Sequence, residues 1–135
     1  MQYQINLNSI FKILETLLII EDKKAKMIKV KINAGICGFT TIVNAEDKGN
    51  YKASFRLESE CPNWKKVDDL LGGKNLNMMT ELFKDKKTGV LNSEVIDIYL
   101  KTIPHVSCPV ISGILKALEV SVGLALPEDA SISFK

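Results

Sequence analysis

The sequence predicts an α+β fold: an antiparallel sheet of three to four strands with helices packed on one face, plus an N-terminal helix. Two observations predict this class. Apolar and polar residues alternate in two stretches, residues 28–33 and 51–58, which is the period of half-buried strands. Apolar residues then recur at helical spacing between residues 62 and 123. A run of strands followed by a run of helices is typical of α+β domains.

Length and composition fit one domain and exclude some partners. A chain of 135 residues can bury a real core without disulfides or a structural metal. The net charge is +2, and Arg56 is the only arginine among eighteen basic residues. Because arginine is the usual reader of phosphates and bases, this composition predicts no nucleic-acid partner.

Residues 1–26 are predicted to form an N-terminal amphipathic helix and hinge, separate from an α+β domain over residues 27–135. Asn8 or Ser9 can cap the helix, and an apolar run then continues to Ile20. The run is too short to span a bilayer, so no membrane partner is expected. The helix is expected to pack on the domain or on a second copy, giving a homo-oligomer. Alternatively, these residues are an extension that precedes a natural start at residue 27.

Three strands are predicted after the N-terminal segment, between residues 27 and 58. Ile28, Val30 and Ile32 alternate with polar residues, and residues 34–38 form a glycine-flanked turn. The second strand is predicted over residues 39–45, a hairpin turn over 46–50 and the third strand over 51–58. Short turns between consecutive strands indicate an antiparallel meander.

Helices are predicted over 62–71, 75–83, 93–101 and 109–123, in each case from apolar spacing and from proline or polar residues near the start. Ile132 and Phe134 alternate with Ser131 and Ser133, which predicts a last strand that joins the sheet. Trp64 is expected to anchor the core. The acidic side chains between residues 58 and 69 are expected to form a solvated face: Glu58, Glu60, Asp68 and Asp69.

The cysteines indicate a reducing compartment. There are three, an odd number, and no signal peptide is visible, so a secreted disulfide framework is not expected. The prediction is a cytoplasmic protein with free or metal-bound thiols.

Two of the cysteines precede a proline. Cys61 is followed by Pro62, and Cys108 by Pro109. Proline is favoured in the first turn of a helix, so both cysteines are predicted to be helix N-caps. Free backbone N–H groups and the positive end of the helix dipole favour a thiolate there.

The third cysteine and the one histidine complete a candidate metal site. Cys37 lies in the glycine-flanked turn, and His105 lies three residues before Cys108. Cys37 ends the first strand and Cys61 the third, and these strands are parallel in a meander, so both can reach one edge of the sheet. Cys37, Cys61, His105 and Cys108 therefore form a Cys₃His set that suits zinc or an iron–sulfur cluster.

Two other hypotheses about these cysteines and this histidine remain open. One is a thiol enzyme in which His105 activates Cys108 as the base. Another is an interaction module without chemistry, whose cysteines are small buried side chains. The metal hypothesis implies a redox or cluster-transfer protein partner. The sequence fixes no substrate.

Three segments resemble an uncharacterised family of small proteins from anaerobic bacteria and archaea. They are residues 32–39 (INAGICGF), residues 105–109 (HVSCP) and residues 116–127, which end in GLALP. The resemblance covers residues 27–135 and leaves the N-terminal helix outside. It implies no established activity, and an anaerobic setting favours an iron–sulfur cluster over zinc.

Overall fold

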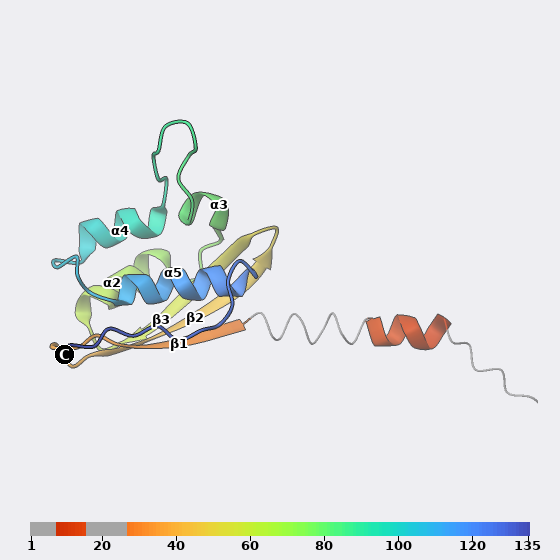
Figure 1. Ribbon diagram of the computed structural model, residues 1–135, viewed down its shortest axis with the longest axis horizontal. Coiled ribbons are helices and arrows are strands. Elements are labelled where there is room, and N and C mark those ends of the chain that lie inside the picture. The colour runs from red at the N-terminus through yellow and green to blue at the C-terminus, as the bar shows by residue number, and fades with distance from the viewer. Residues whose placement is uncertain (1–7, 16–26) are drawn as a thin grey trace, which may run out of the picture.

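The computed structural model describes residues 8–15 and 27–135. Residues 27–135 contain a four-stranded antiparallel sheet with helices on one face (Figure 1), so the predicted α+β class is confirmed. In chain order the elements are β1 (Met27–Asn33), β2 (Thr40–Gly49), β3 (Lys52–Ser59), α2 (Pro62–Leu71), β4 (Leu76–Asn77), α3 (Met78–Glu81), α4 (Glu94–Thr102) and α5 (Val110–Ser121).

The sheet is a meander in the order β1-β2-β3-β4. Val43 of β2 lies between Val30 of β1 and Leu57 of β3, and all three side chains face the helices. The opposite face is polar: Asn44 donates a hydrogen bond to Glu58 across 3.2 Å. One apolar and one polar face is the pattern that the alternation in the sequence predicts.

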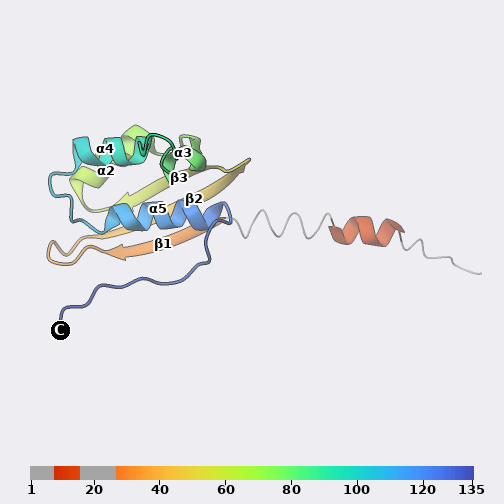
Figure 2. The ribbon, with the colours of Figure 1, turned by 45° about the horizontal axis from the view of Figure 1, so that its top comes forward.

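The helices cover the apolar face in two parts (Figure 2). α5 packs across β1 and β2, α2 packs on β3, and α4 packs on α2. Trp64 and Phe55 are the largest fully buried side chains, so the prediction that Trp64 anchors the core is confirmed. α5 approaches β1 closely at Gly113, where a Cβ would clash with the side chain of Ile32.

The carboxylate of Asp68, in α2, accepts hydrogen bonds at the outer edge of β3. It accepts the backbone N–H of Leu57 at 2.8 Å and two hydrogen bonds from the Arg56 guanidinium at 2.8 and 3.0 Å. Gly73 extends this cover by donating to the carbonyl of Phe55 at 2.9 Å. The expectation that Asp68 belongs to a solvated face was wrong, because the strand edge supplies an N–H that needs an acceptor. Glu58, Glu60 and Asp69 are exposed as expected.

A buried carboxylate fixes the start of α4. Glu81 is 3% exposed and accepts hydrogen bonds from the Ser93 hydroxyl at 2.6 Å and from the N–H groups of Glu94 and Val95, each at 3.1 Å. The Ser93 oxygen in turn accepts the N–H of Ile96 at 3.1 Å as the N-cap. The four-residue helix α3 is thereby tied to α4.

Two turns differ from the predictions. β2 continues to Gly49, so the hairpin reverses at Asn50 and Tyr51, both with positive φ, rather than over residues 46–50. Asp47 supports the bulge there by accepting the N–H of Gly49 at 2.8 Å. The helix predicted over residues 75–83 is a short strand, β4, followed by α3, because Leu76 and Asn77 pair with β3.

The predicted C-terminal strand was wrong. Residues 124–135 contain no strand or helix, and the sheet's fourth strand is β4. Ile132 and Phe134 are 83% and 99% exposed. The segment runs back along the side of the domain where β1 and α5 lie (Figure 2).

Residues 8–15 form a helix, as predicted, and all eight residues are exposed. Its apolar side chains include Ile10, Phe11, Ile13 and Leu14. The rest of the predicted helix to Ile20 and the hinge over residues 21–26 lie outside the described residues. Among the described residues, no helix is long and apolar enough to cross a membrane.

Candidate functional site

Three connections meet at one end of the domain (Figure 1): the β1–β2 turn, the β3–α2 junction and the α4–α5 loop. The β1–β2 turn carries Cys37 and is closed by a hydrogen bond from Ala34 N–H to the carbonyl of Phe39 at 3.1 Å. Gly35 and Gly38, on either side, have φ values of +94° and +74°, which side chains rarely adopt. The glycines flanking Cys37 therefore make this tight turn possible.

These connections enclose a cavity of about 120 Å³. All four residues of the predicted set line it, although they come from three segments far apart in the sequence. The remaining lining is mainly apolar, with two polar side chains: Ala34, Phe39, Thr41, Pro62, Asn63, Trp64 and Val110. The meander topology explains the meeting point, since β1 and β3 run in the same direction and finish at the same end of the sheet.

Cys61 is the N-cap of α2, as predicted, and Pro62 occupies the first turn. The Cys61 side chain makes no capping hydrogen bond to α2, and it lines the cavity instead. The prediction for Cys108 was off by one residue. α5 has Pro109 as its N-cap, and the carbonyl of Pro109 accepts the N–H of Gly113 at 3.2 Å. The backbone of Pro109 is already helical, with φ −72° and ψ −8°, so helical geometry begins directly after Cys108.

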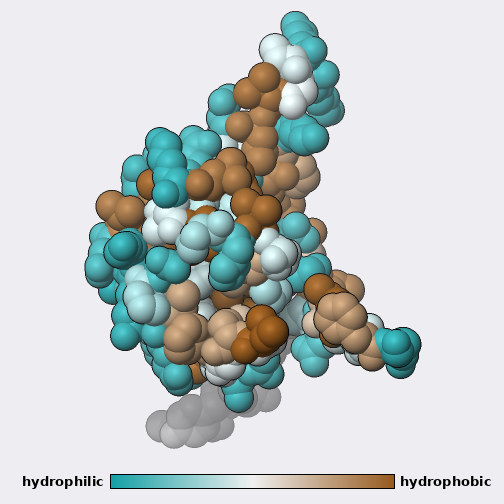
Figure 3. All heavy atoms as spheres, turned by 90° about the vertical axis from the view of Figure 1, so that its left-hand side faces the viewer, coloured by the Kyte–Doolittle hydropathy of each residue, from teal (hydrophilic) through white to brown (hydrophobic). Residues whose placement is uncertain are grey.

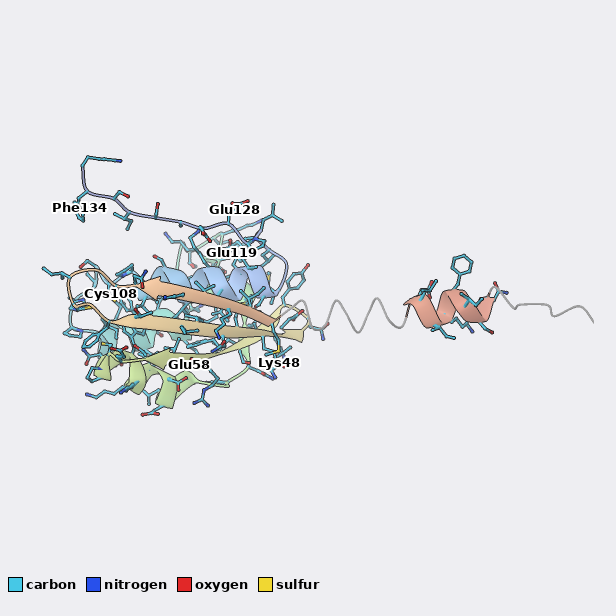
Figure 4. The ribbon with its side chains drawn as sticks, turned by 90° about the horizontal axis from the view of Figure 1, so that it is seen from below. Lys48, Glu58, Cys108, Glu119, Glu128 and Phe134 are labelled. Carbon is cyan, nitrogen blue, oxygen red and sulfur yellow. The ribbon has the colours of Figure 1, made fainter. Side chains whose placement is uncertain are left out.

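The cavity deepens from Cys37 to Cys108. Cys37 is exposed, Cys61 is half-buried and Cys108 is only 7% exposed; all three are free thiols. The buried sulfur of Cys108 accepts a hydrogen bond from the indole N–H of Trp64 at 3.3 Å. Figure 4 labels Cys108 at the end of the molecule where the connections meet.

An aromatic pair supports this wall of the cavity. The rings of Trp64 and Tyr99 stack with centroids 6.1 Å apart and planes 12° apart. The Tyr99 hydroxyl donates to the carbonyl of Val106, which lies between His105 and Cys108 in the chain. Burial, and secondarily the charge of the nearby Cys108, raises the pKa of Tyr99 above its usual value. α2 and α4 thus both hold the loop that carries the two candidate ligands.

The four candidate ligands share a cavity without forming a compact centre. Within residues 8–15 and 27–135, no three His, Cys, Asp or Glu side chains are grouped closely enough to hold one metal ion. His105 is exposed, and Cys37 lies in an exposed turn. The donors that would have to close on a ligand are therefore the ones at the mouth, while Cys108 is fixed at the base.

Apolar side chains surround the mouth of the cavity. Ile36, next to Cys37, is fully exposed, and Val106, next to His105, is 66% exposed. Figure 3 faces this end of the molecule and shows apolar side chains among polar ones. A larger depression of about 400 Å³, where α2 meets the end of α4, is lined mostly by exposed residues such as Lys66 and Lys101 and holds no cysteine or histidine.

Sequence reasoning missed the second role of Trp64. It was expected only to anchor the core, yet its N–H contacts the candidate site. One signal was present: Trp64 follows Cys61 by three residues, and in a helix such residues lie on the same face. No signal linked Tyr99 to the site, because that contact depends on how α4 packs on α2.

The fold and the site define an α+β chain with a cysteine-lined cavity at one end of its sheet. The chain belongs to the Family of unknown function (DUF6951), which it matches over residues 28–134. Comparisons with curated proteins and with solved structures found no match.

Proposed function

We propose that this chain is a small iron–sulfur protein, with Cys37, Cys61 and Cys108 as thiolate ligands and His105 as the nitrogen ligand. The observation that supports it is that all four side chains line one cavity. The chain has no other histidine and no other cysteine, so every soft donor of these two kinds lies at that cavity. Three thiolates and one imidazole suit iron or zinc rather than magnesium or calcium.

The size of the site favours a cluster over a single zinc ion. A tetrahedral zinc centre with Zn–S bonds of about 2.3 Å keeps its sulfurs within about 4 Å of each other and leaves no cavity between them. Here the four side chains are among eleven that line a cavity of about 120 Å³. A cavity of about 150 Å³ accepts a molecule the size of benzene, so the volume suits a group of several atoms. Zinc is the alternative metal, and it would require the mouth of the cavity to close further.

The burial gradient supports a role in electron or cluster transfer. Cys108 would hold the cluster at the base, where the Trp64 N–H contacts its sulfur. Cys37 and His105 would hold it at the exposed mouth, within reach of a redox or cluster-transfer protein partner. Such a cluster needs a reducing environment, which agrees with a cytoplasmic location and with the anaerobic source suggested by the motifs.

The test is the metal and sulfide content of protein purified without oxygen, together with its visible spectrum. We expect stoichiometric iron and sulfide and broad visible absorbance. Cys108→Ser, Cys61→Ser and Cys37→Ser should each lose most of the cluster. Ser107→Ala is the matched control, because Ser107 is exposed beside Cys108 and lines no part of the cavity. Equal iron and sulfide in Cys108→Ser and Ser107→Ala would contradict the proposal.

A thiol enzyme is a second candidate, supported by the hydrogen bond from Trp64 to the Cys108 sulfur. In that case Cys108 would act as nucleophile and His105 as base. This candidate predicts metal-free protein in which Cys108 is alkylated much faster than Cys37, even though Cys37 is more exposed. His105→Ala should then slow that reaction. If Cys37 reacts fastest, exposure alone governs the thiols.

A third candidate is self-association through the N-terminal helix, as in an interaction module. Ile10, Phe11, Ile13 and Leu14 are all more than 40% exposed in a helix of eight described residues. Isolated helices of this length are marginal in water, so a partner would stabilise it. Deletion of residues 1–26 should lower the number of copies in the particle in solution, and an unchanged number of copies would contradict this role.

A further inference from the structure

The two outer edges of the sheet differ in how far other parts of the chain cover them. The outer edge of β3 is covered by Asp68, by Gly73 and by β4. β1 pairs only with β2, so among the described residues its outer edge has no partner. An edge strand of seven residues presents unpaired N–H and C=O groups, and proteins usually cover such an edge.

The apolar surface beside that edge is incompletely covered. The side chains of β1 that face the helices are only half-buried, and so are three apolar side chains of α5 that pack on the core beside the fully buried ones. They are Ile28, Val30 and Ile32 of β1, and Ile111, Leu115 and Val122 of α5. The core is therefore closed at the β3 side and half-open at the β1 side.

Residues 131–134 have the alternating pattern of a strand that could cover the half-open β1 side of the core. Ser131 and Ser133 alternate with Ile132 and Phe134, and both apolar side chains are more than 80% exposed. Figure 4 shows this segment, with Glu128 and Phe134 labelled, extended along the side of the domain rather than folded onto it.

We propose that residues 131–134 of one chain add as a strand to the free edge of β1 of a second copy. Backbone groups of the segment would pair with the outward-facing groups of β1, as in other cases of strand addition. Ile132 and Phe134 would cover the half-open apolar surface between β1 and α5. Glu128 and Asp129 precede the segment, and Lys29 and Lys31 lie on β1, so the charges are complementary.

The second copy, rather than the same chain, is the occupant, because each chain leaves its own segment unpaired. Between residues 125 and 135, the described backbone makes one hydrogen bond, from Glu128 N–H to the carbonyl of Leu126 at 2.9 Å. Two copies can exchange segments symmetrically, so that each edge and each segment finds a partner. This interface is separate from the cysteine cavity and does not depend on a metal.

The test is the mass in solution, measured by light scattering over a dilution series. The probe variant is Ile132→Asp with Phe134→Asp, which places two charges on the apolar side of the strand. The matched control is Ser131→Asp with Ser133→Asp, which adds the same charge to the other side. Both changes lie in exposed residues outside the core, so folding should be retained and is checked by circular dichroism.

We expect a dimer for the natural chain and for the serine control, and a halved mass for the apolar variant. The dimer should also persist when residues 1–26 are deleted, which separates this interface from the N-terminal helix. A monomeric natural chain, or a dimer that survives Ile132→Asp with Phe134→Asp, would overturn the proposal. Amide-exchange protection of residues 131–134 in a monomer would overturn it as well, since it would place the strand on its own chain.

Discussion

The indole N–H of Trp64 donates a hydrogen bond to the sulfur of Cys108 at 3.3 Å, inside the core. The same tryptophan lies one helical turn after Cys61, another residue of the cavity. One side chain thus links the hydrophobic core, the start of α2 and the most buried of the four candidate ligands.

Trp64→Phe should lower the reduction potential of the bound cluster. A hydrogen bond to a ligating sulfur stabilises the more electron-rich reduced state, so removing the donor favours the oxidised state. A redox titration of the loaded protein measures this. Tyr51→Phe is the control, because Tyr51 is an exposed aromatic residue that lines no part of the cavity. A potential that stays the same in Trp64→Phe would show that this contact does not act on a cluster ligand.

Asp68→Ala should destabilise the fold by about 1–3 kcal/mol, because it leaves the Leu57 N–H and the Arg56 guanidinium without their acceptor. Asp69→Ala, at the next and exposed position, should change stability by less than about 0.5 kcal/mol. Urea unfolding of the metal-free proteins measures both. Equal midpoints would mean that the edge of β3 does not need this cap.

Glu81→Ala should cost about 2–3 kcal/mol, since the Ser93 hydroxyl and the N–H groups of Glu94 and Val95 lose a buried acceptor. Glu94→Ala removes a neighbouring acidic side chain whose ion pair with Lys74 is about half exposed, and it should cost less than about 1 kcal/mol. Thermal unfolding distinguishes the two variants. A larger effect at Glu94 would contradict the role assigned to Glu81.

Tyr99 should make the fold sensitive to alkaline pH. Burial and the nearby Cys108 raise its pKa, so the unfolded chain releases this proton at a lower pH than the folded chain. Stability is therefore fully present below the ordinary tyrosine pKa of about 10 and is lost as pH rises from there through the raised value. Urea unfolding at increasing pH should show a shallower decline in Tyr99→Phe, while Tyr51→Phe, at an exposed tyrosine, should follow the natural chain. Parallel curves for all three would refute this assignment.

Much of the fold could be predicted because local signals agree with it. Alternation located β1 and β3, and the prolines and Ser93 located the starts of α2, α4 and α5 to within a residue. The failures occurred where distant packing overrides a local pattern. Residues 75–77 were predicted as helix, yet Leu76 and Asn77 pair with β3. Residues 132–134 alternate like a strand but have no neighbouring strand within the described chain.

The residues of the site could be predicted from the sequence, but their arrangement in space could not. Cys-Pro steps, a glycine-flanked cysteine and a lone histidine stand out in the sequence, and the meander places Cys37 and Cys61 at one end of the sheet. The depth order of the cysteines depends on α5 crossing β1 and β2, and the contacts of Trp64 depend on the packing of α2. Asp68 and Glu81 look like surface carboxylates in the sequence, because nothing local reveals the backbone N–H groups that they accept.

The most direct measurement is the iron, sulfide and zinc content of the chain purified without oxygen, read with its visible spectrum. A cluster held by Cys37, Cys61, His105 and Cys108 predicts stoichiometric iron and sulfide, which Ser107→Ala keeps and Cys108→Ser loses. Stoichiometric zinc without colour would replace the cluster with a structural or hydrolytic metal. A colourless, metal-free and stably folded protein would contradict the metal proposal altogether.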